Sequence, residues 1–164
     1  MDRRQFFTAG VSAIGVMAAL RVAGLLPADD SAAAETFAVV KSEADWKAQL
    51  GSAAYAVLRR HGTERAGSSP LNAEKRAGRF VCAGCDQPLF AARAKFESGT
   101  GWPSFTAPLP DSVGTRTDSG FGMDRTEVHC RRCGGHLGHV FTDGPAPTGL
   151  RYCMNGVALR FEPA

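Results

Sequence analysis

The chain has 164 residues, of which 44% are hydrophobic and 21% are charged, and its formal net charge is +3. This length can bury one compact core but is too short for two full-sized domains, and nothing in it calls for more than a monomer. Its 19 lysines and arginines are scattered along the chain and form no basic stripe, which argues against a nucleic-acid-binding protein.

The first 34 residues have the layout of an export signal. Arg3 and Arg4 precede an apolar run, residues 6–20, that is too short to cross a bilayer comfortably. Paired arginines before an apolar segment resemble the twin-arginine signal of proteins that fold before export. Three alanines just before Glu35 suit a signal peptidase, so we expect the mature chain to begin there. We therefore predict export to the periplasm, with retention at the membrane as the alternative.

Two short helices are predicted next. Ser42 and Asp45 indicate an N-cap and an acidic first turn, so the first helix should run from about there to Leu50. The stretch 53–61 has apolar residues at helical spacing and ends before Gly62, which is a typical C-cap residue.

The sequence pattern changes from Gly67 onward. Gly, Pro, Ser and Asp recur every few residues, and the apolar stretches between them are short, which indicates an all-β region with many turns. We therefore divide the chain into an export signal (1–34), a helical lead-in (35–66) and a β region (67–164). The lead-in and the β region are expected to form one domain, and the β region carries all five cysteines.

Four cysteines form two CxxC pairs, Cys82 with Cys85 and Cys130 with Cys133. Each CxxC turn brings two sulfurs to adjacent corners of a tetrahedron, and two turns complete a closed four-thiolate shell around one zinc ion. The closed shell predicts a structural zinc, which would join distant parts of the β region. Two disulfides are the competing interpretation, because exported proteins meet an oxidising compartment. The matched CxxC spacing favours zinc.

Cys153 is then the only thiol free to do chemistry. In a strand, the period of two places Arg151, Cys153 and Asn155 on one face, and a nearby guanidinium favours the nucleophilic thiolate. In the simpler alternatives, Cys153 is a buried small hydrophobic residue and Asn155-Gly156 is only a hairpin turn.

Two other segments carry residues typical of an active site. His136 and His139 follow the second CxxC pair, and a histidine beside a cysteine can act as proton donor or base. Trp102 and Phe105 belong to a loop bent by glycines and a proline, which can present an apolar wall to a small substrate group. The structural alternatives are buried hydrogen-bonded histidines and a tryptophan that packs on the core.

Taken together, these segments resemble the methionine-R-sulfoxide reductase B family, whose members reduce the R epimer of methionine sulfoxide in proteins. The resemblance extends from about residue 46 to residue 161. The matching segments are the CxxC pairs, GWPSF at 101–105, RTEVHC at 125–130, GGHLGHVF at 134–141 and RYCMN at 151–155. The resemblance implies a mainly β fold of two antiparallel sheets packed as a β-tent, with short N-terminal helices and a structural zinc.

The resemblance also implies roles for single residues. Cys153 matches the catalytic nucleophile, and Trp102 matches the aromatic residue that holds the substrate methyl group, where Phe105 is expected to assist. His139 is expected to be the main acid or water-orienting group, with His136 assisting it. The residues expected to be catalytic are Cys153, His139, His136, Asn155 and Arg151.

One position departs from the family pattern. Many members carry a second, resolving cysteine where this sequence has Thr100. The resemblance therefore implies a one-cysteine enzyme that acts on oxidised proteins or peptides and depends on an external thiol, such as a thioredoxin-like protein, to reduce oxidised Cys153. The rival interpretations are a non-catalytic zinc module that binds a protein partner and a thiol enzyme that consumes peroxide.

Overall fold

A computed structural model describes residues 35–164, so the predicted export signal lies outside the described residues. Within that range, no helix is long and apolar enough to cross a membrane. The described residues contain one α-helix, nine strands and four short 3₁₀ turns.

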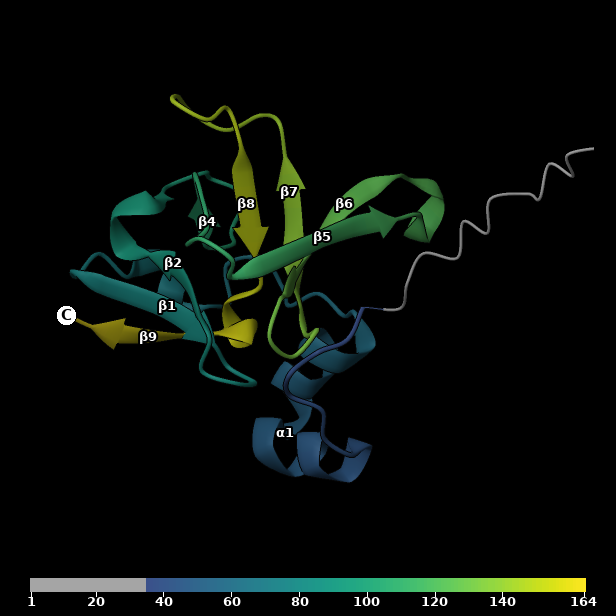
Figure 1. Ribbon diagram of the computed structural model, residues 1–164. Helices are drawn as coiled ribbons and strands as arrows, with labels where there is room; N and C mark the ends of the chain where they lie inside the picture. Colours follow the sequence, from purple (N-terminus) through teal and green to yellow (C-terminus); the bar gives the residue numbers. More distant parts are fainter. Residues whose placement is uncertain (1–34) are drawn as a thin grey trace, which may run out of the picture. The chain divides into compact units, whose positions relative to one another are not determined.

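Two antiparallel sheets form the body of the protein, which confirms the predicted fold class (Figure 1). The smaller sheet has the order β2-β1-β9, with β1 at Gly78–Cys82, β2 at Pro88–Ala91 and β9 at Leu159–Pro163. The larger sheet has the order β3-β4-β8-β7-β6-β5. Its strands are β3 (Lys95–Phe96), β4 (Ser104–Phe105), β5 (Val113–Asp118), β6 (Arg125–Cys130), β7 (His136–Phe141) and β8 (Arg151–Met154).

The two predicted helices are both present and meet at Gly51 within one element, α1 (Glu43–Arg60). Gly51 has a positive φ of 69° and a non-helical ψ, a conformation that glycine adopts without a Cβ clash. The predicted N-cap is confirmed, because the backbone N–H of Asp45 donates to Ser42 Oγ over 3.1 Å. At the other end His61 takes the left-handed conformation, one residue before the expected Gly62. Glycine is needed at position 62 because a Cβ on that residue would meet the Ala56 carbonyl oxygen at 2.9 Å.

The 3₁₀ turns connect the strands. They are η1 (Pro70–Ala73), η2 (Ala92–Ala94), η3 (Gly120–Gly122) and η4 (Gly156–Ala158). The alternative in which Asn155 and Gly156 form a hairpin turn is wrong. Asn155 instead precedes η4, which leads the chain from the larger sheet into β9 of the smaller sheet.

Aromatic side chains from both sheets share one core. Phe80 of the smaller sheet packs on Phe105 of the larger sheet with ring centroids 4.9 Å apart. Phe90 stacks on Phe105 at 4.3 Å, and all three side chains are fully buried. Helix α1 adds Leu58 to this core and packs against β7 and η4. The core therefore fixes the larger sheet, which carries most of the predicted site, against both the helix and the smaller sheet.

Candidate functional site

The four CxxC cysteines come together in space from the two sheets. Cys82 is the last residue of β1 and Cys130 is the last residue of β6, and a tight turn follows each strand. In these turns the N–H of Asp86 donates to the Cys82 carbonyl over 2.9 Å and the N–H of Gly134 donates to the Cys130 carbonyl over 2.8 Å. Each turn returns the second cysteine of its pair to the same point, so the cluster joins the smaller sheet to the larger one.

The sulfur positions fit a metal ion. Sγ of Cys82 lies 3.8 Å from that of Cys133, Sγ of Cys85 lies 3.5 Å from that of Cys130, and all four lie within 4.8 Å of one another. A tetrahedral zinc shell with bonds of about 2.3 Å would separate its sulfurs by about 3.8 Å, whereas a disulfide requires about 2.0 Å. The thiols are free, which favours a metal site over two disulfides. These cysteines could therefore hold a metal ion.

A second cluster lines a pocket of about 180 Å³, which we call the Cys153 pocket. Cys153 of β8 and His139 of β7 are directly paired across the two strands, so both side chains project to the same side of the sheet. The lining residues are Thr63, Trp102, Arg125, Gly138, His139, Phe141, Cys153 and Asn155. The pocket thus brings together four predicted site residues, Cys153, His139, Trp102 and Asn155, which come from three segments of the sequence.

Cys153 is partly buried on the central strand of this site. Its other strand neighbour is Ser104, and Oγ1 of Thr100 lies 3.8 Å from its Sγ. The four remaining cysteines of the chain all belong to the metal cluster. The polar group beside the Cys153 thiol is therefore a hydroxyl and not a second thiol. Met154, the next residue of β8, is fully buried on the core side, as the strand period predicts.

His139 is held by a carboxylate. Its Nε2 donates to Asp118 Oδ2 over 2.7 Å, and Arg125 Nη2 donates to the same oxygen over 2.8 Å. The hydrogen bond from His139, followed by that from the Gly120 N–H, lowers the pKa of Asp118 to about 2, so this carboxylate is ionised and can only accept. Burial lowers the pKa of His139, and the hydrogen bond to Asp118 acts against this shift. His139 is therefore fixed in one tautomer, with its proton on Nε2.

His136 lies behind His139 and is not among the residues that line the pocket. The two rings are 5.3 Å apart, and His136 Nδ1 donates to Glu127 Oε1 over 2.7 Å. Burial alone would raise the pKa of Glu127, but hydrogen bonds from His136 and Arg116 outweigh it and hold the value at about 2. His61, at the end of α1, contacts the same carboxylate at 3.2 Å. Glu127 therefore joins three elements behind the site.

Arg151 is the first residue of β8 and is not among the residues that line the Cys153 pocket. Its guanidinium donates to both carboxylate oxygens of Asp143, over 2.9 and 2.8 Å, and stacks on the Phe141 ring at 4.4 Å. The hydrogen bonds to Asp143 raise the pKa of Arg151, so the group remains a fixed positive charge two residues from Cys153.

Phe105 is not part of the pocket. It occupies the opposite face of β4 from Ser104, which pairs with Cys153, and its ring is buried between Phe80 and Phe90. The period of two along a strand explains this placement, because Trp102 belongs to the loop before β4 while Phe105 follows the strand alternation. Phe105 does not line the Cys153 pocket, so its position does not support the predicted contact with substrate.

Several residues of the site were missed by the sequence interpretation. Asp118, Glu127, Arg125 and Glu64 were not singled out, although two of them belong to the RTEVHC segment. That segment was the only available signal, because Asp118 and Glu64 lie in stretches without a recognisable motif. The register of β5 on β6 and of β6 on β7 brings the carboxylates of Asp118 and Glu127 to the histidines.

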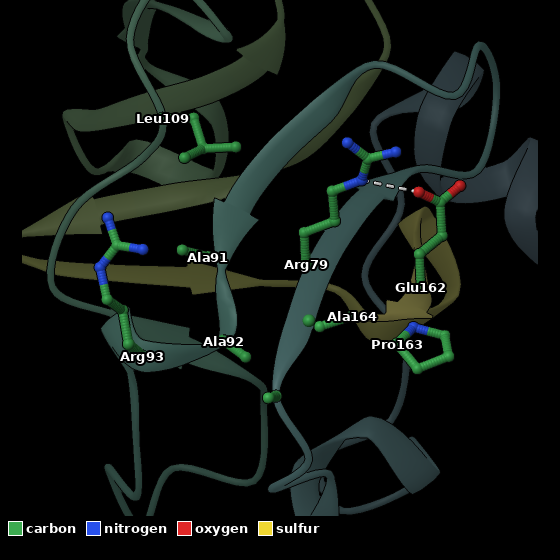
Figure 2. Close-up of a pocket in the computed structure, with 10 residues that line it drawn as sticks. Arg79, Ala91, Ala92, Arg93, Leu109, Glu162, Pro163 and Ala164 are labelled. Atoms are coloured by element: carbon green, nitrogen blue, oxygen red, sulfur yellow. Dashed lines mark hydrogen bonds and ion pairs between the residues drawn. The ribbon is translucent and has the colours of Figure 1, made fainter.

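A larger hollow of about 610 Å³ lies over the smaller sheet (Figure 2). Residues of β1, β2 and β9 line it, and Arg79 of β1 donates to Glu162 of the neighbouring β9 over 2.7 Å. Among the described residues that line this hollow, none carries a thiol, an imidazole or a hydroxyl. The smaller Cys153 pocket, whose lining includes both a thiol and an imidazole, is therefore the candidate active site.

The sequence matches the family model described as the SelR domain over residues 50–163. Peptide methionine sulfoxide reductase MsrB of Bradyrhizobium diazoefficiens is 56% identical over 126 residues, which cover 76% of this chain and 91% of that protein. Proteins of the same name from Leptospira interrogans and Methanosarcina barkeri are 50% and 54% identical. Those alignments cover 77% and 76% of this chain, and 97% and 89% of the two relatives. The chain therefore belongs to the SelR domain family, the family of the MsrB peptide methionine sulfoxide reductases.

Proposed function

We propose that this protein reduces the R epimer of methionine sulfoxide in peptides and proteins, with Cys153 as the nucleophile. As a member of its family it is an oxidoreductase that acts on methionine sulfoxide. The observation that carries the finer proposal is the Cys153 pocket, in which a partly buried thiol lies opposite an imidazole and beside an indole. A pocket of about 180 Å³ suits a small group such as an S-methyl sulfoxide.

The proposed first step transfers the sulfoxide oxygen to Cys153. The Cys153 thiolate attacks the substrate sulfur while the sulfoxide oxygen takes up a proton, because an unprotonated oxygen is a poor leaving group. His139 supplies or orients this proton, and Trp102 holds the methyl group. The products are methionine and a Cys153 sulfenic acid, so the substrate is reduced by two electrons and the thiolate is oxidised by two.

An external thiol completes the cycle. Two thiols reduce the sulfenic acid to the Cys153 thiol and yield a disulfide and water. The presence of Thr100 at 3.8 Å from Sγ, and the commitment of the other cysteines to the metal cluster, support an external reductant over an internal one. A thioredoxin-like protein or a small-molecule thiol has the required chemistry.

We also propose that the metal is a single structural zinc ion. Cys82, Cys85, Cys130 and Cys133 would hold it, and a shell of four thiolates leaves no open position for substrate. Its contribution would be to fix the two sheets. The further proposals are that residues 1–34 direct export, that the mature protein acts as a periplasmic monomer, and that retention at the membrane is the alternative outcome.

The first experiment measures reduction of separated R and S epimers of a blocked peptide-like methionine sulfoxide by the protein from Glu35 onward, with dithiothreitol as electron donor. We expect turnover of the R epimer alone. Turnover of the S epimer instead would contradict the proposed specificity. Turnover of neither epimer by a protein that contains zinc would favour a zinc module that binds a partner, and consumption of peroxide instead would favour the peroxidase interpretation.

A further inference from the structure

One segment outside the catalytic sheet forms part of the pocket wall. Residues 61–67 lead from the end of α1 toward β1, and Thr63 of this segment lines the Cys153 pocket. The segment is held against the loop that carries Trp102, because the N–H of Gly67 donates to the Gly101 carbonyl over 2.7 Å. A Cβ on Gly101 would meet Ala66 Cβ at 2.9 Å, so the two backbones approach as closely as glycine permits. Glu64 lies at the centre of this contact.

Glu64 binds Trp102 through its backbone. The indole Nε1–H of Trp102 donates to the Glu64 carbonyl oxygen over 3.2 Å. This bond uses the single hydrogen-bond donor of the indole, so the orientation of the ring follows the position of this carbonyl. The position of the carbonyl depends in turn on what anchors Glu64.

Three further hydrogen bonds anchor Glu64 to the chain immediately after the nucleophile. Its N–H donates to Asn155 Oδ1 over 2.9 Å, and its carboxylate accepts from the N–H groups of Gly156 over 2.5 Å and Val157 over 3.1 Å. Asn155 is itself buried and fixed, since its Nδ2 and its backbone N–H both donate to the Leu137 carbonyl of β7, over 3.1 and 2.8 Å. The carboxylate bonds are charge-assisted and therefore stronger than neutral ones.

We propose that Glu64 is a positioning residue that fixes the indole of Trp102 relative to the thiol of Cys153, and thereby sets the selectivity for an S-methyl group. One end of Glu64 holds the aromatic wall and the other end holds the turn that follows Cys153, so its contacts connect the two sides of the pocket. The inference rests on the proposed function, in which Trp102 contacts the substrate methyl. A displacement of about 1 Å between such groups is enough to lower a catalytic rate about 100-fold.

The test compares two substrates on the protein from Glu35 onward. The substrates are the R sulfoxides of blocked methionine and of blocked ethionine, which differ by one methylene, and the variants are Glu64→Ala and Glu64→Gln. We expect Glu64→Ala to raise KM for the methionine substrate and to lower the methyl-to-ethyl ratio of kcat/KM by about 10-fold. Glu64→Gln keeps one oxygen acceptor and should have a smaller effect in the same direction.

A general loss of stability would not change this ratio, which makes it diagnostic. Glu74→Gln is the matched control, because the Glu74 carboxylate binds Arg76 and makes no hydrogen bond with Trp102 or with residues 155–157. Quenching of tryptophan fluorescence by acrylamide gives a second readout. The chain has two tryptophans, and Trp46 is only 3% exposed, so increased quenching in Glu64→Ala would report a freed Trp102.

The outcomes separate the inference from the function on which it rests. Trp102→Phe should itself change the methyl-to-ethyl ratio. An altered ratio in Trp102→Phe with wild-type ratios in both Glu64 variants would overturn the role of Glu64 and leave the proposed function intact. A wild-type protein without activity on the R epimer would overturn both. If Glu64→Ala does not fold, Glu64→Gln decides the question by the same ratio.

Discussion

The five cysteines of this chain differ in what surrounds them. Cys82 and Cys130 are fully buried among other sulfurs, whereas Cys153 is partly exposed in a pocket with an imidazole and an indole. A sulfur in a closed tetrahedral shell has no free position for substrate, while the Cys153 thiol is open to attack a small ligand. Under the proposed function, metal binding and catalysis therefore belong to different sulfurs.

Replacement of Cys153 by serine is expected to abolish reduction of the R sulfoxide, by at least about 1,000-fold, because a hydroxyl is a far weaker nucleophile than a thiolate. Zinc content should stay at one ion per chain, since Cys153 is not part of the metal cluster. Turnover with dithiothreitol and metal analysis of the same sample check both statements. Substantial activity in this variant would remove Cys153 from the mechanism.

Asp118→Asn should lower kcat/KM by about 10- to 100-fold, because the amide no longer holds His139 as a charged acceptor does. The pH profile of activity should show in which direction the substitution shifts the pKa of His139. Asp118 raises the pKa of His139 against burial, while Arg125 and His136 lower it. If protonated His139 is the acid, activity falls as pH rises through this pKa, so the descending limb should move to lower pH in the variant.

Asp124→Asn is the matched control for this measurement. Asp124 lies in the connection that follows Asp118, between β5 and β6, and its carboxylate accepts a hydrogen bond from Ser119 and none from His139. Its pH profile should match the wild type. Identical profiles for Asp118→Asn and the wild type would show that His139 is not the titrating acid.

At the scale of elements, the site depends on how β5, β6 and β7 are aligned. Glu127 of β6 pairs with Arg116 of β5 and His139 of β7 in the strand register, and its side chain binds Arg116 and His136. His61 brings the end of α1 to the same carboxylate. One buried acidic side chain therefore links the end of the helix to Arg116 of β5 and His136 of β7.

Glu127→Gln is expected to lower the free energy of unfolding by about 3 kcal/mol, because it leaves buried hydrogen-bond donors and a cation without their charged partner. Denaturant unfolding of the zinc-bound protein measures this difference. Glu97→Gln should change stability by less than about 0.5 kcal/mol, since the Glu97 side chain is 65% exposed and its ion pair is with Lys95. Equal effects of the two substitutions would refute a special role for Glu127.

At the scale of the whole molecule, the metal cluster connects the two sheets. Cys82 ends a strand of the smaller sheet and Cys130 ends a strand of the larger sheet, and the shared aromatic core is the other main connection between them. A bound cation would hold four thiolates at this point. Without it, four clustered thiols would remain and the metal would no longer link the two sheets.

Cys130→Ser should therefore abolish stoichiometric zinc binding and lower the midpoint of thermal unfolding by more than about 10 °C. Calorimetry and metal analysis are the measurements. The Cys153→Ser variant serves as the control, since it also removes one thiol but should keep both the metal and the wild-type midpoint. A zinc-free Cys130→Ser protein with an unchanged midpoint would exclude a structural role for the metal.

The sequence alone predicted the four cysteines of the metal cluster and four of the residues that line the Cys153 pocket. The spacing of the CxxC pairs predicted one cluster that joins distant parts of the chain, and the cluster is present as predicted. The family resemblance and the two antiparallel sheets are confirmed, and the two helical stretches were correctly placed on either side of Gly51. These features could be predicted because metal-ligand spacing, turn residues and helix caps are patterns of a few neighbouring residues.

Only the tertiary structure decided which residues support the chemistry. Asp118 reaches His139, and Glu64 reaches Trp102 and the turn after Cys153, across 21, 38 and more than 90 positions of the sequence. It also placed Phe105 in the core and His136 behind the pocket. The physical reason is that hydrogen-bond partners and the facing of side chains depend on strand register and sheet packing, which arise from the whole core and from no single motif.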